Sequence, residues 1–93
     1  MQPPLEPWVA KIGAFLLGKL AEDDFIAASV VTDHDKDQGQ HCEAWYYAGM
    51  KCLLSGDKKA AADDFGQCLD TKQAGFTEYI LAKAELKALG IGN

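Results

Sequence analysis

Residues 42–65 read CEAWYYAGMKCLLSGDKKAAADDF and carry the signals of two helices joined by a tight turn. Hydrophobic residues recur at helical spacing on both sides of the Ser-Gly-Asp at residues 55–57. Gly56 suits the left-handed C′ position that ends a helix, and Asp57 is a good N-cap for the next one. The stretch therefore predicts a helical hairpin, with its first helix starting at about His41.

The first helix of this hairpin is hydrophobic over a wide arc. One face carries Trp45, Ala48, Gly49 and Cys52, and the adjacent face carries Tyr46, Met50, Leu53 and Leu54. A helix with so broad an apolar surface has to be packed on two sides. The second helix is simpler, because its apolar residues share one face. These residues are Ala61, Phe65, Cys68 and Leu69.

Two shorter helices are predicted before the hairpin. Pro7 suits the first turn of a helix, and apolar residues follow it at helical spacing as far as residue 20. Acidic residues 22–24 favour the start of a second helix, which is expected to reach about Val31. Residues 1–6 are then an N-terminal extension.

Two further segments complete the predicted organisation. Residues 32–40, TDHDKDQGQ, contain no apolar residue and are predicted to form a loop or the solvated ends of the helices beside it. Gly75 is expected to break the fourth helix, and Thr77 is expected to cap a fifth that Gly90 ends. The result is an all-α domain of about five helices over residues 7–90, with no strand.

The chain also repeats itself. A shift of 34 residues places Trp45 on Tyr79, and the same shift places Ala48 on Ala82. In the other direction, Trp8 precedes Trp45 by 37 residues, which is close to the same interval. Helices of one kind therefore start at nearly regular spacing, as expected for a helical repeat.

Residues Cys42–Lys72 resemble the tetratricopeptide repeat. Trp45, Gly49, Ala61 and Phe65 stand at that family's Trp, Gly, first Ala and Phe positions, and Cys68 stands at the second Ala. Gly49 and Ala61 let two helices approach closely, while Trp45 and Phe65 fill the space between them. Trp8 and Tyr79 are the corresponding aromatic residues of the flanking units.

The resemblance implies a right-handed superhelix of antiparallel helix pairs. Its units are a degenerate repeat at 7–31, the loop at 32–40, a full repeat at 41–74 and a capping helix at 77–90. More narrowly, the residues from Cys42 onward are similar to the C-terminal part of NlpI-like tetratricopeptide lipoproteins of bacteria. In that family such repeats serve as adaptors for other envelope proteins, which favours a non-catalytic protein-interaction module.

In tetratricopeptide arrays the first helices of successive pairs line a concave groove. Carried over by position, the resemblance places seven residues on that surface, and these are Val9, Leu16, Glu43, Tyr46, Met50, Leu53 and Ile80. We hypothesise that this groove accepts an apolar segment of a partner, either an amphipathic helix or an extended peptide. The alternative is that Tyr46 and Met50 are buried by neighbouring helices of this same chain.

Self-association is a second hypothesis. Two helix pairs and one further helix are fewer than the three or so repeats that usually bury a continuous core. The apolar side of the first or third helix could then pack against a second copy, because symmetric dimers are the commonest way to cover such a surface. The chain would in this case be a structural homodimer with no separate peptide ligand.

Composition disfavours several classes of partner. The 93 residues carry a formal net charge of -5, and no window concentrates lysine, so nucleic acid and anionic membranes are poor partners. No stretch approaches the roughly 20 apolar residues that cross a bilayer. The N-terminal Met-Gln-Pro-Pro does not have the layout of a secretory signal. We therefore expect a cytoplasmic protein without membrane insertion, or a periplasmic one if the chain is a fragment of a lipoprotein.

Catalysis and cofactor binding are not expected. No nucleophile elbow, phosphate-binding loop or HExxH motif occurs. His41 and Cys42 are adjacent on a helix, so their side chains diverge by about 100°, and the same objection applies to Asp63 and Asp64. The sequence therefore indicates no catalytic residue and no cofactor.

Metal sites are not expected either. The acidic residues from Asp33 lack the Gly and Glu that a calcium loop requires at its sixth and twelfth positions. His34, His41 and Cys42 offer only three zinc donors at unsuitable spacing. The three cysteines, residues 42, 52 and 68, show no CxxC spacing and are predicted to behave as small hydrophobic residues.

Overall fold

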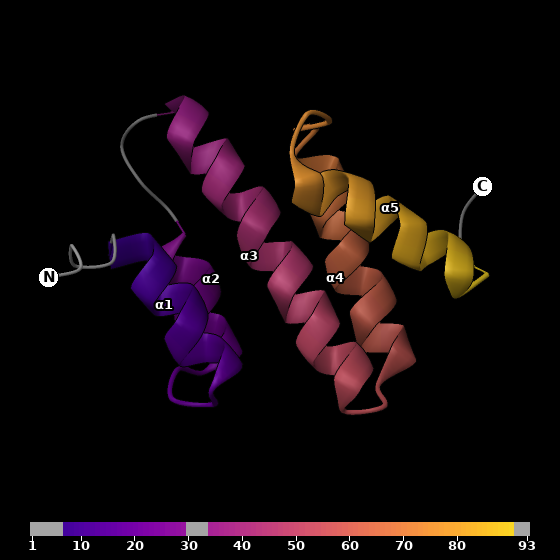
Figure 1. Ribbon diagram of the computed structural model, residues 1–93, viewed down its shortest axis with the longest axis horizontal. Coiled ribbons are helices and arrows are strands. Elements are labelled where there is room, and N and C mark those ends of the chain that lie inside the picture. Colours follow the sequence, from indigo (N-terminus) through magenta and orange to yellow (C-terminus); the bar gives the residue numbers. More distant parts are fainter. Residues whose placement is uncertain (1–6, 30–33, 91–93) are drawn as a thin grey trace, which may run out of the picture.

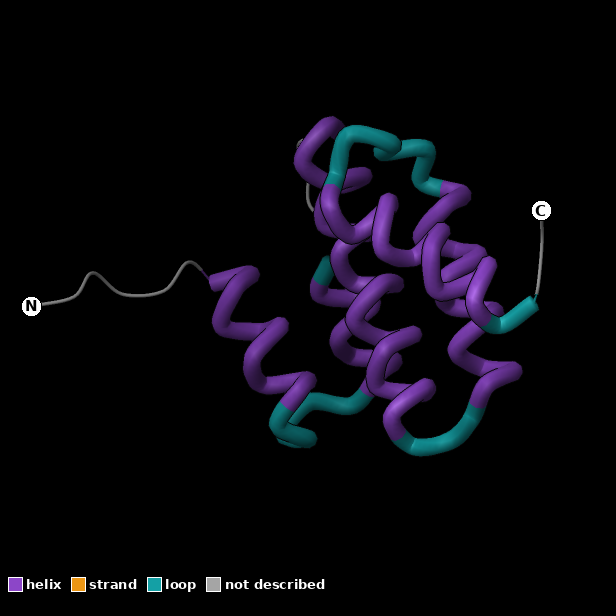
Figure 2. The backbone as a smooth tube through the Cα atoms, turned by 45° about the vertical axis from the view of Figure 1, so that its right-hand side comes forward, coloured by secondary structure: helices purple, strands orange, loops and turns teal. Residues whose placement is uncertain are grey.

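The computed structural model describes residues 7–29 and 34–90, and these form five α-helices with no strand among them. The helices are α1 (Pro7–Leu16), α2 (Glu22–Ala28), α3 (His34–Leu54), α4 (Lys58–Asp70) and α5 (Thr77–Ala88). Helix α3 lies in the middle, with α1 and α2 on one side of it and α4 and α5 on the other (Figure 1). The loops α1–α2 and α3–α4 lie at one end of the molecule and the loop α4–α5 at the opposite end (Figure 2). The prediction of an all-α domain of five helices is therefore confirmed.

Helix α3 is packed on two sides, as its wide apolar arc predicts. Towards α1 and α2 it contributes Ala44 and Ala48 to a first core cluster, whose other buried members are Trp8, Phe15 and Phe25. Towards α4 and α5 it contributes Cys42 to a second cluster, whose other buried members are Ala61, Phe65, Cys68 and Ala82. One helix therefore joins two cores.

Helices α3 and α4 approach each other closely at Gly49. A Cβ atom added to Gly49 would lie 2.6 Å from Cε1 of Phe65, so the ring occupies the space that any larger residue would need. Phe65 and the neighbouring Ala61 are fully buried. The turn below them forms as predicted, because Gly56 has φ +89° and Asp57 Oδ1 accepts a hydrogen bond of 3.0 Å from the backbone N–H of Ala60.

Aromatic stacking holds the N-terminal helix pair together. The Phe25 ring of α2 lies between two rings of α1, at centroid distances of 5.2 Å from Trp8 and 4.2 Å from Phe15. Lys51 of α3 then joins this stack to the rest of the molecule. Its Nζ donates a hydrogen bond of 2.7 Å to the Phe15 carbonyl oxygen and lies 4.4 Å from the centroid of the Phe15 ring.

Of the two alternatives predicted for residues 32–40, the loop is wrong from His34 onward, because these residues form the beginning of α3, as the alternative of a helix end allows. Packing from the α4–α5 loop accounts for this difference. A Cβ atom on Gly39 would lie 2.7 Å from Cζ of Phe76, so this ring covers a turn of helix that has no apolar side chain of its own. Residues 1–6 and 30–33 lie outside the described residues, and with them the predicted N-terminal extension and the end of the first repeat.

Three helix boundaries also differ from the prediction. Helix α1 ends at Leu16, before the left-handed Gly18 (φ +79°), and not at residue 20. Helix α4 ends at Asp70, close to Lys72, whose φ is 58°, and not at Gly75. Thr77 is the first residue of α5 and not its cap, since Phe76 occupies the N-cap position without a side-chain hydrogen bond.

The contacts between helices repeat along the chain. Helices α1 and α2 pack against each other and both contact α3, and in the same way α3 and α4 pack against each other and both contact α5. Within the described part of the chain, no helix is both long and apolar enough to cross a membrane.

We predict that Gly49→Ala destabilises the protein by about 1–3 kcal/mol, because the new methyl group overlaps the Phe65 ring in a closely packed interface. Unfolding in urea, followed by circular dichroism, measures this change. Gly66→Ala on α4 is the matched control, since nothing lies within 4 Å of its added Cβ atom. That change should stabilise the helix by up to about 1 kcal/mol. Equal stability of Gly49→Ala and the wild type would contradict the close approach.

Candidate protein-binding face

Several large hydrophobic side chains remain exposed to solvent in the folded chain. These are Val9, Leu16, Leu17, Leu54, Ile80 and Leu81, each with more than 40% of its surface accessible. Three of them, Val9, Leu16 and Ile80, belong to the predicted groove. Val9 and Leu16 lie on α1, and Ile80 lies on α5. The first and the last helix therefore both carry apolar side chains that the described chain leaves about half exposed.

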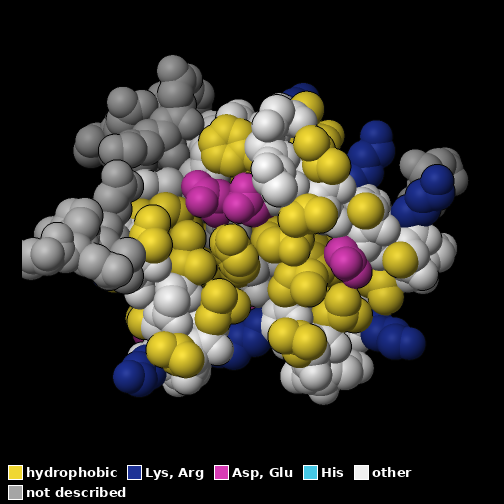
Figure 3. Space-filling model, viewed as in Figure 1, with side chains coloured by type: hydrophobic (Ala, Val, Ile, Leu, Met, Phe, Trp, Pro, Cys, Tyr) yellow, Lys and Arg dark blue, Asp and Glu magenta, His cyan; other side chains and the backbone are white. Residues whose placement is uncertain are grey.

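The view of Figure 3 shows that hydrophobic side chains form a broad area over α1, α3 and α5. Two adjacent acidic side chains lie within this area, and lysine side chains lie towards its margins. We refer to this surface over α1, α3 and α5 as the three-helix face.

The remaining groove residues lie on α3 and are only half-exposed. Tyr46, Met50 and Leu53 pack against the second core cluster. The Tyr46 ring lies 6.1 Å from the Phe65 ring and 5.1 Å from the Tyr47 ring, measured between centroids. The structure thus brings these three residues together against α4 and α5, on the side of α3 away from Val9 and Leu16. The alternative prediction, that Tyr46 and Met50 are buried by helices of the same chain, is therefore true of part of each of these side chains.

Glu43 of α3 is also half-buried, and a second carboxylate from α5 lies near it. Burial, followed by the negative charge of Glu78, raises the pKa of Glu43 above its usual value. Glu78 accepts a hydrogen bond of 3.5 Å from the Tyr47 hydroxyl. Burial and the charges of Glu78 and Glu43 also raise the pKa of Tyr47.

These two glutamates have little positive charge to balance them. Among the described residues, no lysine forms an ion pair with either carboxylate. The buried Nε1 of Trp8 lies near Glu43 and has no partner at hydrogen-bonding distance, but this N–H group still partly offsets the rise in the pKa of Glu43. A carboxylate pair of this kind attracts a cation, and a basic side chain from another molecule can supply it.

The residues of the repeat signature form the interior. Ala61, Phe65 and Cys68 are fully buried, and Trp8 is 9% exposed. Trp45 and Tyr79 are partly buried against the second cluster, and Gly49 lies against Phe65 as described above. These residues position α1, α3 and α5. Ala61, Phe65 and Cys68 are inaccessible to a ligand, whereas Trp45 and Tyr79 keep part of their surface exposed.

The sequence prediction missed several polar groups. Glu78 of α5 approaches Glu43 and Tyr47 of α3 only because α5 packs on α3. Asp64 is 8% exposed, although its neighbour Asp63 is exposed. Spacing offered a signal here, because Asp64 lies three residues from Ala61 and four from Cys68, on the same buried face of α4. Burial and the charge of Glu22 raise the pKa of Asp64 to about 7.

The cysteine predictions are confirmed for residues 42 and 68, which are free and fully buried. The structure adds that their sulfur atoms lie 3.4 Å apart. Burial, followed by the charge of Asp64, raises the pKa of Cys52 to about 12. His41 Nδ1 lies 2.6 Å from Ser29 Oγ, whereas Cys42 points into the second cluster, so the structure does not bring these two side chains to one site.

No protein-family model, no curated protein sequence and no solved structure matches this chain. Its function is therefore inferred from the chemistry of the three-helix face.

We predict that Glu43→Gln removes part of the pH dependence of stability. The folded state raises the pKa of Glu43 above the unfolded value of 4.5, so it binds this proton more tightly than the unfolded state does. The free energy of unfolding of the wild type should therefore fall as pH rises from about 4.5. Urea unfolding at a series of pH values should show a smaller fall in Glu43→Gln. Glu78→Gln should also reduce this fall in the free energy of unfolding. Parallel pH profiles of the wild type, Glu43→Gln and Glu78→Gln would contradict the coupling between the two glutamates.

Proposed function

We propose that this chain is a non-catalytic adaptor module with a tetratricopeptide-like superhelical arrangement, and that it binds a protein segment on the three-helix face. The proposed segment is an amphipathic helix or an extended peptide that carries apolar side chains and at least one lysine or arginine. The observation that carries this proposal is the combination of exposed apolar residues on α1 and α5 with the unbalanced Glu43–Glu78 pair between them.

The order of helix contacts supports the repeat architecture. Each helix pair packs both of its members against the first helix of the next unit, so α1, α3 and α5 correspond to the first helices of successive repeats. Such stacking places the first helices along one surface, on which tetratricopeptide-like arrays are expected to bind. The close contact between Gly49 and Phe65 is the packing that the repeat signature requires.

The apolar residues supply contact area and the carboxylates supply selectivity. Val9, Leu16 and Ile80 are 45%, 47% and 58% exposed, so a partner can bury a large part of each side chain. The pair of Glu43 and Glu78 favours a basic side chain and disfavours an acidic one, because like charges at an interface are repelled. A partner segment that carries both apolar side chains and a basic side chain is therefore complementary to the three-helix face.

Two synthetic amphipathic peptides test this proposal, one with lysine and one with glutamate on its polar face and both with the same apolar residues. We expect the lysine peptide to bind more tightly, as measured by fluorescence anisotropy. Val9→Asp and Ile80→Asp should each weaken its binding by about tenfold or more, because each places a charge in an apolar contact. The double variant Glu43→Gln/Glu78→Gln should reduce the preference between the peptides.

Ala27→Asp is the control, because Ala27 is exposed on α2, which does not belong to the three-helix face. It should leave peptide binding unchanged. Equal affinity for the two peptides, or binding that survives both Val9→Asp and Ile80→Asp, would contradict the proposal. Circular dichroism verifies that each variant keeps its helical content.

Self-association is a second candidate, and a specific observation favours it. Leu17 and Leu54 are 74% and 82% exposed. Leu17 follows α1 and Leu54 ends α3, so both lie at the end of the molecule that carries the loops α1–α2 and α3–α4 (Figure 1). Two such ends could cover each other in a symmetric dimer.

If the chain forms this dimer, light scattering should report twice the monomer mass of 10.1 kDa at high protein concentration. Leu17→Glu combined with Leu54→Glu should then restore the monomer, because four charges would meet at the dimer contact. A monomeric wild type at the highest concentration measured would rule out this candidate and leave the adaptor proposal unaffected.

A further inference from the structure

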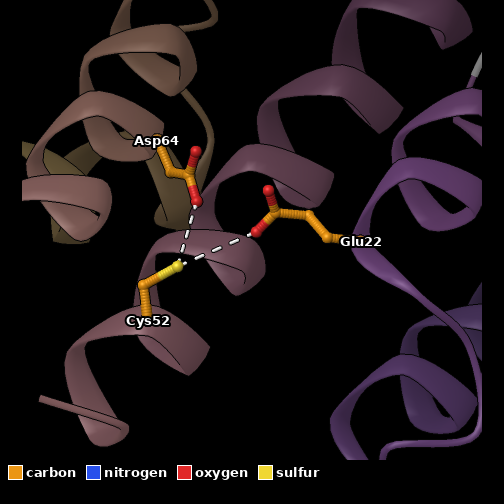
Figure 4. A group of neighbouring side chains, drawn as sticks. All are labelled: Glu22, Cys52 and Asp64. Atoms are coloured by element: carbon orange, nitrogen blue, oxygen red, sulfur yellow. Dashed lines mark hydrogen bonds between the residues drawn. The ribbon is translucent and has the colours of Figure 1, made fainter. Parts of the chain in front are cut away.

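Three side chains from three different helices converge near the turn between α3 and α4. Glu22 is the first residue of α2, Cys52 belongs to the last turn of α3, and Asp64 lies in the middle of α4. Both carboxylates point towards the Cys52 sulfur (Figure 4). The Sγ atom lies 3.5 Å from Asp64 Oδ2 and 3.8 Å from Glu22 Oε1, and the three candidate ligand atoms all lie within 4.8 Å of one another.

The buried member of this cluster has no cation beside it. Asp64 is 8% exposed, and its hydrogen-bond donor is the weak thiol donor of Cys52. Within residues 7–29 and 34–90, no lysine, histidine or backbone N–H group bonds to the Asp64 carboxylate. A buried carboxylate ordinarily needs a positive charge or several strong donors. Its surroundings instead supply a second carboxylate, Glu22.

The two sulfur–oxygen separations match those between ligands of one zinc ion. A tetrahedral zinc site with Zn–S of about 2.3 Å and Zn–O of about 2.0 Å places sulfur and oxygen ligands about 3.5 Å apart. The two sulfur–oxygen distances of 3.5 and 3.8 Å need little adjustment to reach this geometry. Three protein ligands leave a fourth position for water, and Glu22 and Cys52 are both partly accessible to solvent.

We propose that Glu22, Cys52 and Asp64 form a zinc-binding site. On binding, the Cys52 thiol releases its proton to solvent, as does the Asp64 carboxyl group where it is protonated, and the sulfur becomes a ligand together with one oxygen from each carboxylate. The thiolate favours zinc over magnesium or calcium, which prefer oxygen ligands alone. This inference does not depend on the proposed binding of a protein segment.

Zinc at this position would strengthen the link between two helices whose backbones are not in contact and which meet here only through the Glu22 and Asp64 side chains. Helices α2 and α4 each pack against α3 but not against each other. A shared metal ion would tie α2 to the α3–α4 hairpin and add to the attachment that Lys51 gives to α1. Zinc should therefore raise the melting temperature of the folded chain, since it binds the folded state and not the separated helices.

Calorimetric titration of the full chain, after removal of metals with a chelator, tests the site. We expect one zinc ion per chain, no binding of magnesium and a higher melting temperature with zinc. Cobalt should give the near-ultraviolet absorption band of a cobalt–thiolate bond. Cys52→Ser should abolish this band, and Cys52→Ser, Asp64→Asn and Glu22→Gln should each weaken zinc binding by at least tenfold.

Asp63→Asn is the matched control, because Asp63 is the exposed neighbour of Asp64 on α4. It should bind zinc as the wild type does. Each ligand variant is nearly the same shape as the residue it replaces, and circular dichroism verifies that the helices remain. Absence of zinc binding would overturn the proposal. Binding that persists in Cys52→Ser would also overturn it, since the metal would then be held elsewhere, for example by the Cys42–Cys68 pair.

Discussion

The contact between Gly49 and the Phe65 ring is the constraint on which the rest of this structure depends. Because residue 49 has no side chain, the aromatic ring of α4 can lie directly against the backbone of α3. The two helices then form one hairpin with a fully buried seam, to which Ala61 and Cys68 contribute small side chains. Every other helix packs on this hairpin or on a neighbour that does.

The central position of α3 explains how a short chain supports two cores. Its small residues Ala44 and Ala48 accept the aromatic stack of the N-terminal pair, whereas Cys42 and the half-buried Tyr46 belong to the cluster formed with α4 and α5. Each core alone is small, and such cores bury limited apolar surface. Because both cores include side chains of α3, the packing of each core helps to hold this helix in place for the other. The same arrangement leaves α1, α3 and α5 with apolar side chains on a common surface (Figure 3).

Polar groups at the helix contacts distinguish this chain from a plain helical bundle. The Asp64 carboxylate of α4 is buried near a thiol of α3 and a carboxylate of α2. At the contact between the N-terminal helix pair and α3, Ser29 Oγ lies 2.6 Å from His41 Nδ1. Glu43 of α3 and Glu78 of α5 lie close enough for the charge of Glu78 to raise the pKa of Glu43, and no described lysine forms an ion pair with either of them. Such groups lower stability unless a partner or an ion compensates them. They are therefore the positions at which a partner or an ion would stabilise the fold.

The amino-acid sequence by itself determined the helical hairpin. Gly56 and Asp57 specify its turn, and the spacing of Ala61, Phe65 and Cys68 specifies a buried face, because turn chemistry and helical periodicity act between residues close together in the chain. Only the tertiary structure decided where α3 begins, since Phe76 packs over Gly39 from a distant loop. It also decided the burial of Asp64 and the pairing of Glu43 with Glu78. These side chains are separated by long stretches of sequence and come together only when the helices pack. Local sequence patterns do not predict how distant helices pack.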